Sequence, residues 1–272
     1  MSGRLVVCPT PIGNLEDVTL RVLAALREAD LVACEDTRRT RVLLDRYGVA
    51  ARLVSYHEHN ERTRASELVE RMRAGEVVAL VSDAGMPLVS DPGYVVVRAC
   101  VAAGLPVEVL PGPSAAITAL VASGLPADDW HFAGFLPRKK GELWALLGEG
   151  GGTLVAFESP RRLPGTLALL ASIDPSRAVA VCRELTKAHE EIVRGTAAEL
   201  AERYEGKPPK GEIVLVLGPP ADSSAPRDAA VDALRELVEA GARPRKAAAV
   251  VARLTGGSAN DLYRSLTDSR DP

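Results

Sequence analysis

Short apolar runs alternate with helical segments through the first 110 residues, and this alternation constrains the fold more than any other feature of the chain. The runs are rich in Val, Leu and Ala and lack polar alternation, which is typical of strands buried on both faces. Expected strands span residues 4–8, 30–34, 52–55, 77–81 and 107–110. Helical spacing is found at residues 19–28, 38–47, 62–73 and 94–103. The order strand–helix–strand predicts a parallel sheet with helices on both faces.

A second α/β series follows a break at Gly124-Leu125-Pro126. Its expected strands are residues 130–134, 153–157, 178–182, 190–194 and 212–217, and its expected helices are 139–147, 162–171 and 197–204. We therefore predict an N-terminal α/β domain over residues 1–120 and a C-terminal α/β domain over residues 121–218.

Residues 218–228 are rich in Pro, Ser, Ala and Asp and read as a linker. Residues 229–272 after it are predicted to form a basic helical tail, with helices at 229–240, 245–254 and 259–266. Between residues 243 and 267 there is one acidic residue, Asp261, and five basic ones: Arg243, Arg245, Lys246, Arg253 and Arg264. A short basic helix–turn–helix fits this pattern, and so does a solvated capping bundle.

The composition excludes several classes of protein. A formal net charge of -3 gives no overall attraction to nucleic acid, so any RNA contact must come from local basic patches. No window approaches the ~18 apolar residues that would cross a membrane, and no signal peptide is recognised at the start. Four scattered Cys and four His show no metal-ligand spacing, so we expect no metal site and a reduced, cytoplasmic protein.

The candidate site lies in the loops that leave the carboxyl ends of the parallel strands, where open α/β sheets bind their ligands. The first loop, Pro9-Thr10-Pro11-Ile12-Gly13-Asn14, is neither a Gly-x-Gly-x-x-Gly nor a P-loop sequence. Its two prolines remove backbone N–H donors that a phosphate cradle needs, which argues against NAD, FAD and ATP.

The next loops are dense in charged and small residues. Residues 35–41 combine two carboxylates with three arginines, and Asp36 or Thr37 is expected to cap the following helix. Residues 56–61 contain His57, a possible base or an ordinary surface histidine. In residues 82–93 we expect Ser90 or Asp91 to cap a helix that starts at Pro92. The loops predict a small, neutral to acidic pocket without a phosphate cradle.

Taken together, these loops resemble those of the tetrapyrrole methylase superfamily, and most closely its branch that methylates small-subunit ribosomal RNA. The matching segments are residues 7–15, 35–38, 80–85, 87, 91–94, 110–120, 134–137, 157–159, 183–187, 210–212 and 245–249. The resemblance covers nearly the whole chain and is specific as a set, although each motif alone is weak. Met86 stands where the family usually has Thr. This difference puts a polar contact at that position in doubt but leaves the expected methyl donor unchanged.

The resemblance implies a homodimer of two α/β domains with S-adenosylmethionine in the cleft between them. It implies 2′-O-methylation of a cytidine ribose in the decoding region of 16S ribosomal RNA. The residues that would line the cofactor are Pro11, Asp83, Gly85, Met86, Leu88, Ser114, Ala115, Phe157 and Glu158. A base for the hydroxyl proton could be Asp36, Glu158 or His57, and we favour Asp36, with Arg38 holding a phosphate or the carboxylate itself.

RNA would be held by basic patches at residues 38–41, 138–140 and 161–162 and by the tail. Two other functions compete with this interpretation. One is methylation of a corrin or porphyrin precursor, but such enzymes typically carry a Gly-x-Gly-Pro-Gly loop after the first strand, which this chain lacks. The other is a catalytically inactive RNA-binding assembly factor, against which the intact loops at 83–87 and 111–115 argue.

Overall fold

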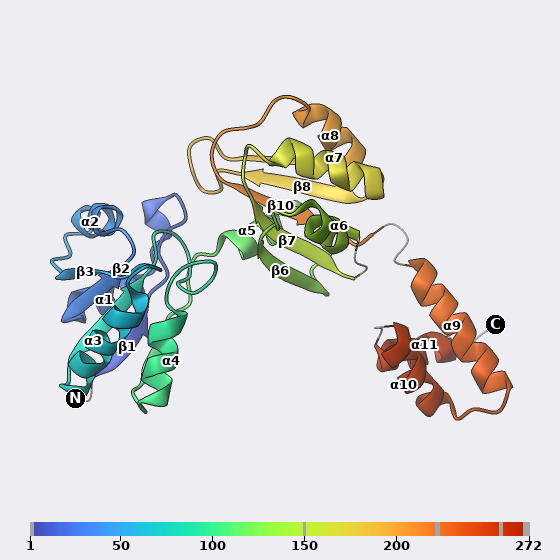
Figure 1. Cartoon of the computed structure of the whole chain (residues 1–272), viewed down its shortest axis with the longest axis horizontal. Helices are drawn as coiled ribbons and strands as arrows, with labels where there is room; N and C mark the ends of the chain where they lie inside the picture. The colour runs from blue at the N-terminus through green and yellow to red at the C-terminus, as the bar shows by residue number, and fades with distance from the viewer. Residues whose placement is uncertain (1–2, 149–150, 221–223, 256–257, 269–272) are drawn as a thin grey trace.

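The first of two five-stranded sheets is entirely parallel, with strand order β3-β2-β4-β1-β5 (Figure 1). The computed structural model describes residues 3–148, 151–220, 224–255 and 258–268. The strands are β1 (Arg4–Val7), β2 (Leu31–Cys34), β3 (Leu53–Ser55), β4 (Val77–Val81) and β5 (Val107–Val109). Each strand agrees with its predicted range to within one residue, and the predicted fold class is confirmed.

Helices cover both faces of the first sheet, which explains why its strands are continuously apolar. Val6 and Val32 pack with α1 (Leu20–Glu28) and α2 (Thr37–Arg46) on one face. Leu5 and Leu31 point the other way and pack with α3 (Glu61–Arg73) and α4 (Tyr94–Ala102). A short 3-10 helix, η1 (Leu15–Asp17), precedes α1. Successive side chains of one strand therefore serve two separate cores.

The second sheet is mixed, with strand order β6-β7-β10-β8-β9. Its strands are β6 (Trp130–Phe135), β7 (Thr153–Glu158), β8 (Ala178–Arg183), β9 (Glu191–Thr196) and β10 (Ile213–Leu217). Only β6 and β7 pair in parallel, whereas β10 runs antiparallel to both β7 and β8, and β8 runs antiparallel to β9. One face is covered by α6 (Lys140–Gly148), α7 (Leu163–Ile173) and α8 (Ala197–Tyr204).

The opposite face of the second sheet is covered by α5 (Ala115–Ser123), the helix that follows the last strand of the first sheet. Ala116, Ala119 and Leu120 pack against a cluster that includes Val155 and Val214. Figure 1 shows α5 lying between the two sheets. The helix thus joins the two halves covalently and contributes its core contacts to the second.

Three helices form a separate basic unit at the carboxyl end: α9 (Ser224–Glu239), α10 (Pro244–Thr255) and α11 (Ala259–Asp268). Leu234, Val251 and Leu262 lie in its small core. The linker prediction over 218–228 was wrong at its end, because the backbone is already helical from Ser224; a proline in the first turn does not prevent helix formation. The predicted tail also includes residues 256–257 and 269–272, which lie outside the described residues.

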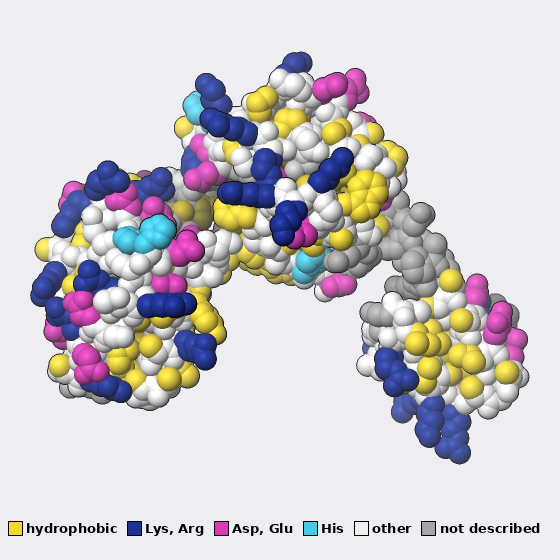
Figure 2. Space-filling view, in the orientation of Figure 1, with side chains coloured by type: hydrophobic (Ala, Val, Ile, Leu, Met, Phe, Trp, Pro, Cys, Tyr) yellow, Lys and Arg dark blue, Asp and Glu magenta, His cyan; other side chains and the backbone are white. Residues whose placement is uncertain are grey.

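The tail lies apart from both sheets and carries a cluster of Lys and Arg on one edge (Figure 2). Arg243, Arg245 and Lys246 are exposed at the start of α10, and the guanidinium of Arg245 lies 5.4 Å from the centroid of the Tyr263 ring. Among the described helices, none is long and apolar enough to cross a membrane.

Candidate functional site

A cavity of about 340 Å³ lies between the loops of the first sheet and one edge of the second. Its lining comes from the loops after β1, β4 and β5, from the ends of β6, β7 and β8, and from the start of β10. The lining residues are Ile12, Ala84, Gly85, Met86, Val89, Ser90, Asp91, Ser114, Ala115, Phe135, Phe157, Glu158, Ser159, Pro160, Cys182, Leu185, Gly211, Glu212, Ile213 and Val214.

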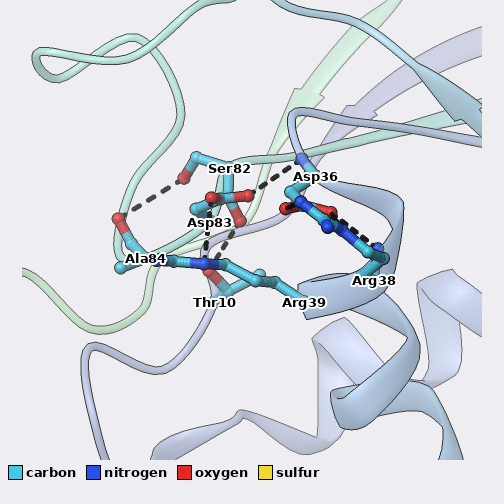
Figure 3. A network of polar contacts seen from close by, with 7 residues as sticks. All are labelled: Thr10, Asp36, Arg38, Arg39, Ser82, Asp83 and Ala84. Carbon is cyan, nitrogen blue, oxygen red and sulfur yellow. Dashed lines mark hydrogen bonds and ion pairs between the residues drawn. The ribbon is translucent and has the colours of Figure 1, made fainter.

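Hydrogen bonds between the β1 and β4 loops shape the floor of the cavity. Thr10 and Gly85 exchange two backbone hydrogen bonds of 2.9 Å, and the Thr10 hydroxyl donates to the Ser82 carbonyl at 3.0 Å (Figure 3). Gly85 has a φ of 79°, a backbone region that L side chains rarely adopt. Leu88 and Ser90 also have positive φ values, 75° and 64°, and strained backbone of this kind concentrates at functional sites.

Six of the nine predicted cofactor residues line this cavity. They are Gly85, Met86, Ser114, Ala115, Phe157 and Glu158. The other three, Pro11, Asp83 and Leu88, do not line it. Pro11 is buried behind Ile12, and Leu88 packs toward Gly93, where an added Cβ would meet the Leu88 Cδ1 atom at 2.6 Å.

The Asp83 carboxylate holds two loops together. One oxygen accepts a 3.0 Å hydrogen bond from the backbone N–H of Asp36, and the other lies 3.4 Å from Nε of Arg39 (Figure 3). Asp83 thereby ties the loop after β4 to the loop after β2. Its carboxylate oxygens are used within the protein, which suits a residue that positions the site.

Asp36 and Arg38, the predicted catalytic pair, contact each other outside the cavity lining. Asp36 is the N-cap of α2, and its carboxylate accepts hydrogen bonds from the Arg38 backbone at 2.8 Å and from the guanidinium at 2.8 and 3.1 Å. These bonds lower the pKa of Asp36 to about 2. Such a carboxylate is a weak proton acceptor, because it holds a proton poorly at neutral pH.

The Glu158 carboxylate faces α7 and is fully engaged. It accepts hydrogen bonds from the Thr166 hydroxyl at 2.6 Å and from the Ser159 N–H at 2.7 Å, and it lies 3.4 Å from Nε of Arg162. Arg162 also donates to the carbonyls of Leu136 and Pro137. Arg162, predicted to contact RNA, therefore uses its guanidinium to fix the turn between β7 and α7.

Asp91 is the site residue that sequence reasoning missed. It was expected, with Ser90, to cap a helix starting at Pro92, but that prediction was wrong. The helix α4 begins at Tyr94, and its N-cap is Gly93 with a φ of 145°. Leu88 packs so closely on Gly93 that a side chain there would clash, and the chain passes Asp91 before the helix starts. Asp91 is thus free to line the cavity.

Burial raises the pKa of Asp91 to about 6, and the negative charges of Glu35 and Asp83 act in the same direction, while the Ser82 hydroxyl lowers it. Burial and Asp83 also raise the pKa of Glu35. His57, the third predicted base, does not line the cavity, and its Nδ1 atom has no hydrogen-bond partner among the described residues. Asp91 is therefore the cavity carboxylate best suited to accept a proton near neutral pH.

The cavity fits a cation with a flat apolar part. Its charged lining residues, Asp91, Glu158 and Glu212, are all carboxylates, with no Lys or Arg among them. Phe157 packs edge-on against Phe132 and Phe135, with ring centroids 5.0 and 5.3 Å apart, and offers a rigid aromatic wall. Acidic and aromatic groups suit a sulfonium attached to an adenosine and disfavour a phosphate.

The Cys, His, Asp and Glu side chains of the described residues form no group that could hold a metal ion. All four cysteines are free and buried, and burial raises the pKa of Cys182, which lines the cavity, to about 11. That thiol is neutral near pH 7. In the part of the chain that the structure describes, no three His, Cys, Asp or Glu side chains come together as metal ligands.

Comparison with known proteins also indicates a methyltransferase, and the similarity extends over most of the chain. The family model of the Tetrapyrrole (Corrin/Porphyrin) Methylases matches residues 4–201. The protein is 48% identical to a ribosomal RNA small subunit methyltransferase I of Mesorhizobium japonicum, over 98% of this chain and 92% of that one. It is 46% identical to a Thermotoga maritima protein of the same name, over 79% of this chain and 98% of the relative.

Among solved structures, uroporphyrin-III-C-methyltransferase from Thermus thermophilus superposes with a TM-score of 0.59 at 25% identity, covering 80% of this chain and 94% of that one. The two sheets and their helices therefore follow a known arrangement. The sequence similarity to the ribosomal RNA enzymes is much higher than the similarity to this solved structure.

Proposed function

Because this chain belongs to the tetrapyrrole methylase family, we propose that it transfers a methyl group to the 2′-oxygen of a cytidine in the decoding region of 16S ribosomal RNA. The chain is a methyltransferase, and its methyl donor is S-adenosylmethionine. The observation that carries the proposal is the cavity itself, whose charged lining residues are all carboxylates. It can hold a donor that is cationic at sulfur and has no phosphate.

The acceptor is proposed from similarity over the whole chain. The relatives at 48% and 46% identity are named for small-subunit ribosomal RNA, whereas the solved uroporphyrin methyltransferase is 25% identical. The first loop, with Pro9 and Pro11 in place of a Gly-rich sequence, agrees with the RNA branch. A tetrapyrrole acceptor is the weaker alternative.

We propose that Gly85, Met86, Ser114 and Ala115 contact the donor from the first half and Phe157 from the second. Pro11, Asp83 and Leu88 act from behind the cavity wall, and the engaged carboxylate of Glu158 supports the turn on the opposite side. When bound, the donor would supply an electrophilic methyl group attached to a sulfonium, and the positive charge on the sulfur would disperse as the methyl group is transferred to the oxygen. The partly closed apolar cavity excludes water from that charge.

Asp91 is proposed to accept the proton of the ribose hydroxyl. It lines the cavity, and its raised pKa keeps affinity for a proton near neutral pH. Asp36 stays the alternative acceptor, with Arg38 holding its carboxylate. In that alternative the Arg38 ion pair would have to open before Asp36 could bind a proton.

We further propose that the protein is a cytoplasmic homodimer. Apolar side chains are exposed on α4, on the edge strand β5 and on α5. Val101, Val109 and Val121 are 66%, 57% and 75% exposed. Exposed apolar side chains of this kind mark interfaces when they form one surface. Light scattering coupled to size-exclusion chromatography tests the mass directly.

The proposed function is tested with labelled S-adenosylmethionine and small ribosomal subunits that lack the modification. We expect label in the RNA, and digestion to nucleosides should place it on the 2′-oxygen of a cytidine. Subunits that already carry the modification are the control and should take up no label. Label on another nucleotide would overturn the assigned acceptor, and no label on RNA with donor binding intact would direct the search to small-molecule acceptors.

A further inference from the structure

A second cavity, of about 380 Å³, is lined mostly by cationic side chains. It is lined by Arg183, Glu191, Arg203, Tyr204, Lys207, Pro209 and Lys210. Four of these side chains are cationic and one is anionic, which leaves a net positive charge. The first cavity has carboxylates as its only charged lining residues. The charged lining residues of the two cavities are therefore mostly of opposite sign.

In the second cavity the two arginines have an acidic partner among the described residues and the two lysines do not. Glu191 lies 3.1 Å from Nε of Arg183 and 3.2 Å from Nη2 of Arg203, so one carboxylate holds both guanidinium groups in place. Lys207 and Lys210 are exposed, and over the described ranges neither ammonium group has an ion pair or hydrogen bond. The arginines are thus already paired with Glu191, and the two lysines are the cations available to a ligand.

Two stretches of backbone join the cavities. Cys182 lines the first cavity and Arg183 the second, while Lys210 lines the second and Gly211 the first. The Arg183 guanidinium donates to the Lys210 carbonyl at 3.4 Å and links these stretches. Gly211 has a φ of 98°, and an added Cβ would lie 2.5 Å from the Glu184 side chain. Cys182 packs on the α5 side of the second sheet and Arg183 points to the opposite side, where α8 lies. The backbone at the end of β8 and the start of β10 therefore separates the two cavities.

We propose that this second cavity binds the phosphodiester backbone of the RNA strand next to the nucleotide that is methylated. The inference rests on the proposed function. A ribose whose 2′-oxygen reaches the first cavity carries a phosphate on either side, and the chain must leave the acidic cavity past its rim. The adjoining cations meet that backbone as it leaves. Lysine binds phosphate oxygens as a compact charge, and the two paired arginines add to the positive potential around the lysines.

Other basic groups near the cavity are less available. The guanidinium of Arg38 is held by Asp36, that of Arg39 by Asp83, and Lys139 lies 2.8 Å from Glu142. Arg162 donates to the backbone carbonyls of Leu136 and Pro137, which follow β6. The patches expected from sequence at 38–41, 138–140 and 161–162 therefore contain several cations that are already paired. Lys207 and Lys210 were not among the predicted RNA contacts.

The test compares a double variant, Lys207→Ala with Lys210→Ala, with a matched control, Arg62→Ala with Arg98→Ala. The control removes the same charge from exposed positions on α3 and α4. We expect the first variant to bind small ribosomal subunits about tenfold more weakly at about 0.1 M salt, and the slope of log K against log salt to fall by about 1.4. The control should stay within about twofold, and S-adenosylmethionine affinity should be unchanged in both.

A photo-crosslinking residue at position 207 identifies what the cavity faces in the complex with subunits. Crosslinks to RNA near the methylated cytidine support the proposal. Crosslinks to a ribosomal protein, or equal binding by the double variant and the wild type, overturn it. Methylation of subunits by the wild type is measured in parallel: if it occurs while the double variant binds normally, the inference fails and the proposed function stands. If the wild type methylates no RNA, the proposed function itself fails.

Discussion

The two sheets contribute to the cavity in different ways. In the first sheet all strands are parallel, so the loops after β1, β4 and β5 reach the site from carboxyl ends. In the second sheet β7 and β8 contribute carboxyl ends, but the antiparallel β10 contributes its amino end, at Ile213 and Val214. The first half places a carboxylate with a raised pKa at the cavity, and the second half places an aromatic wall and an engaged carboxylate there. A reactive half and a supporting half thus face each other.

The sharpest test of this contrast is Asp91→Asn. We expect the turnover number to fall about 100-fold or more, because an amide cannot accept the hydroxyl proton. The affinity for S-adenosylmethionine should change by less than about threefold, and turnover is measured with saturating donor and subunits. Asp36→Asn is the matched variant from the same half and should lose much less turnover. The opposite result, a loss of about 100-fold in Asp36→Asn and little loss in Asp91→Asn, would make Asp36 the proton acceptor.

The pH dependence of turnover is the next test of the first half. Since the pKa of Asp91 is raised to about 6, turnover should fall about tenfold per pH unit below about pH 6 and level off above it. The folded state binds this proton more tightly than the unfolded chain does. The contribution of Asp91 to stability therefore increases as the pH falls from about 6 to about 4. A profile measured for Asp91→Asn should lack the limb near pH 6.

In the second half, Glu158→Gln should reduce stability more than chemistry. The carboxylate accepts from Thr166 and Ser159 and faces Arg162, and an amide satisfies only part of that set. We expect unfolding in urea to show a loss of about 1–3 kcal/mol. Turnover per folded molecule should stay within about threefold of the wild type at a temperature well below the transition. A hundredfold loss of turnover with unchanged stability would place Glu158 in the chemistry.

The smallest effect is expected when the tail is removed after Gly218. The Thermotoga maritima relative aligns over 217 residues, which make up 98% of its length and 79% of this chain. The two sheets should keep their melting temperature and their affinity for S-adenosylmethionine, both measured by thermal shift. Only binding to subunits should weaken, since the exposed cations of α10 are lost. Loss of donor binding would show that the tail supports the site.

Much of the fold was readable from the sequence because the strands are apolar on both faces and the helices between them are amphipathic. The direction of the strands in the second half was not readable. Strand β10 is fully buried like a parallel strand, yet it runs antiparallel to β7 and β8, and burial alone carries no direction. The proposed boundary at 120/121 falls within α5 and stays a prediction; a helix pattern does not tell which sheet it packs on.

Six predicted cofactor residues line the cavity because their loops are fixed by strand order. The remaining differences arise from local geometry. Asp91 was read as a cap because Ser-Asp-Pro is a common helix start, but Gly93 has a φ of 145°, outside the helical region, and the helix starts at Tyr94. Arg38 was expected to hold either a phosphate or the Asp36 carboxylate, and in the structure it contacts that carboxylate. The ion pair of Asp83 with Arg39 was not predicted, because spacing alone does not show which loops lie next to each other.

The packing of α5 sets an order on synthesis. This helix is complete at Ser123, but the sheet it covers closes only when β10 ends at Leu217. At a translation rate of about 5–20 residues per second, roughly 5–20 s pass between the synthesis of α5 and that of the last strand it packs against. The first sheet can form in that interval, but the apolar side of α5 stays exposed on the nascent chain. A chaperone that shields short apolar helices on the emerging chain would act at this stage.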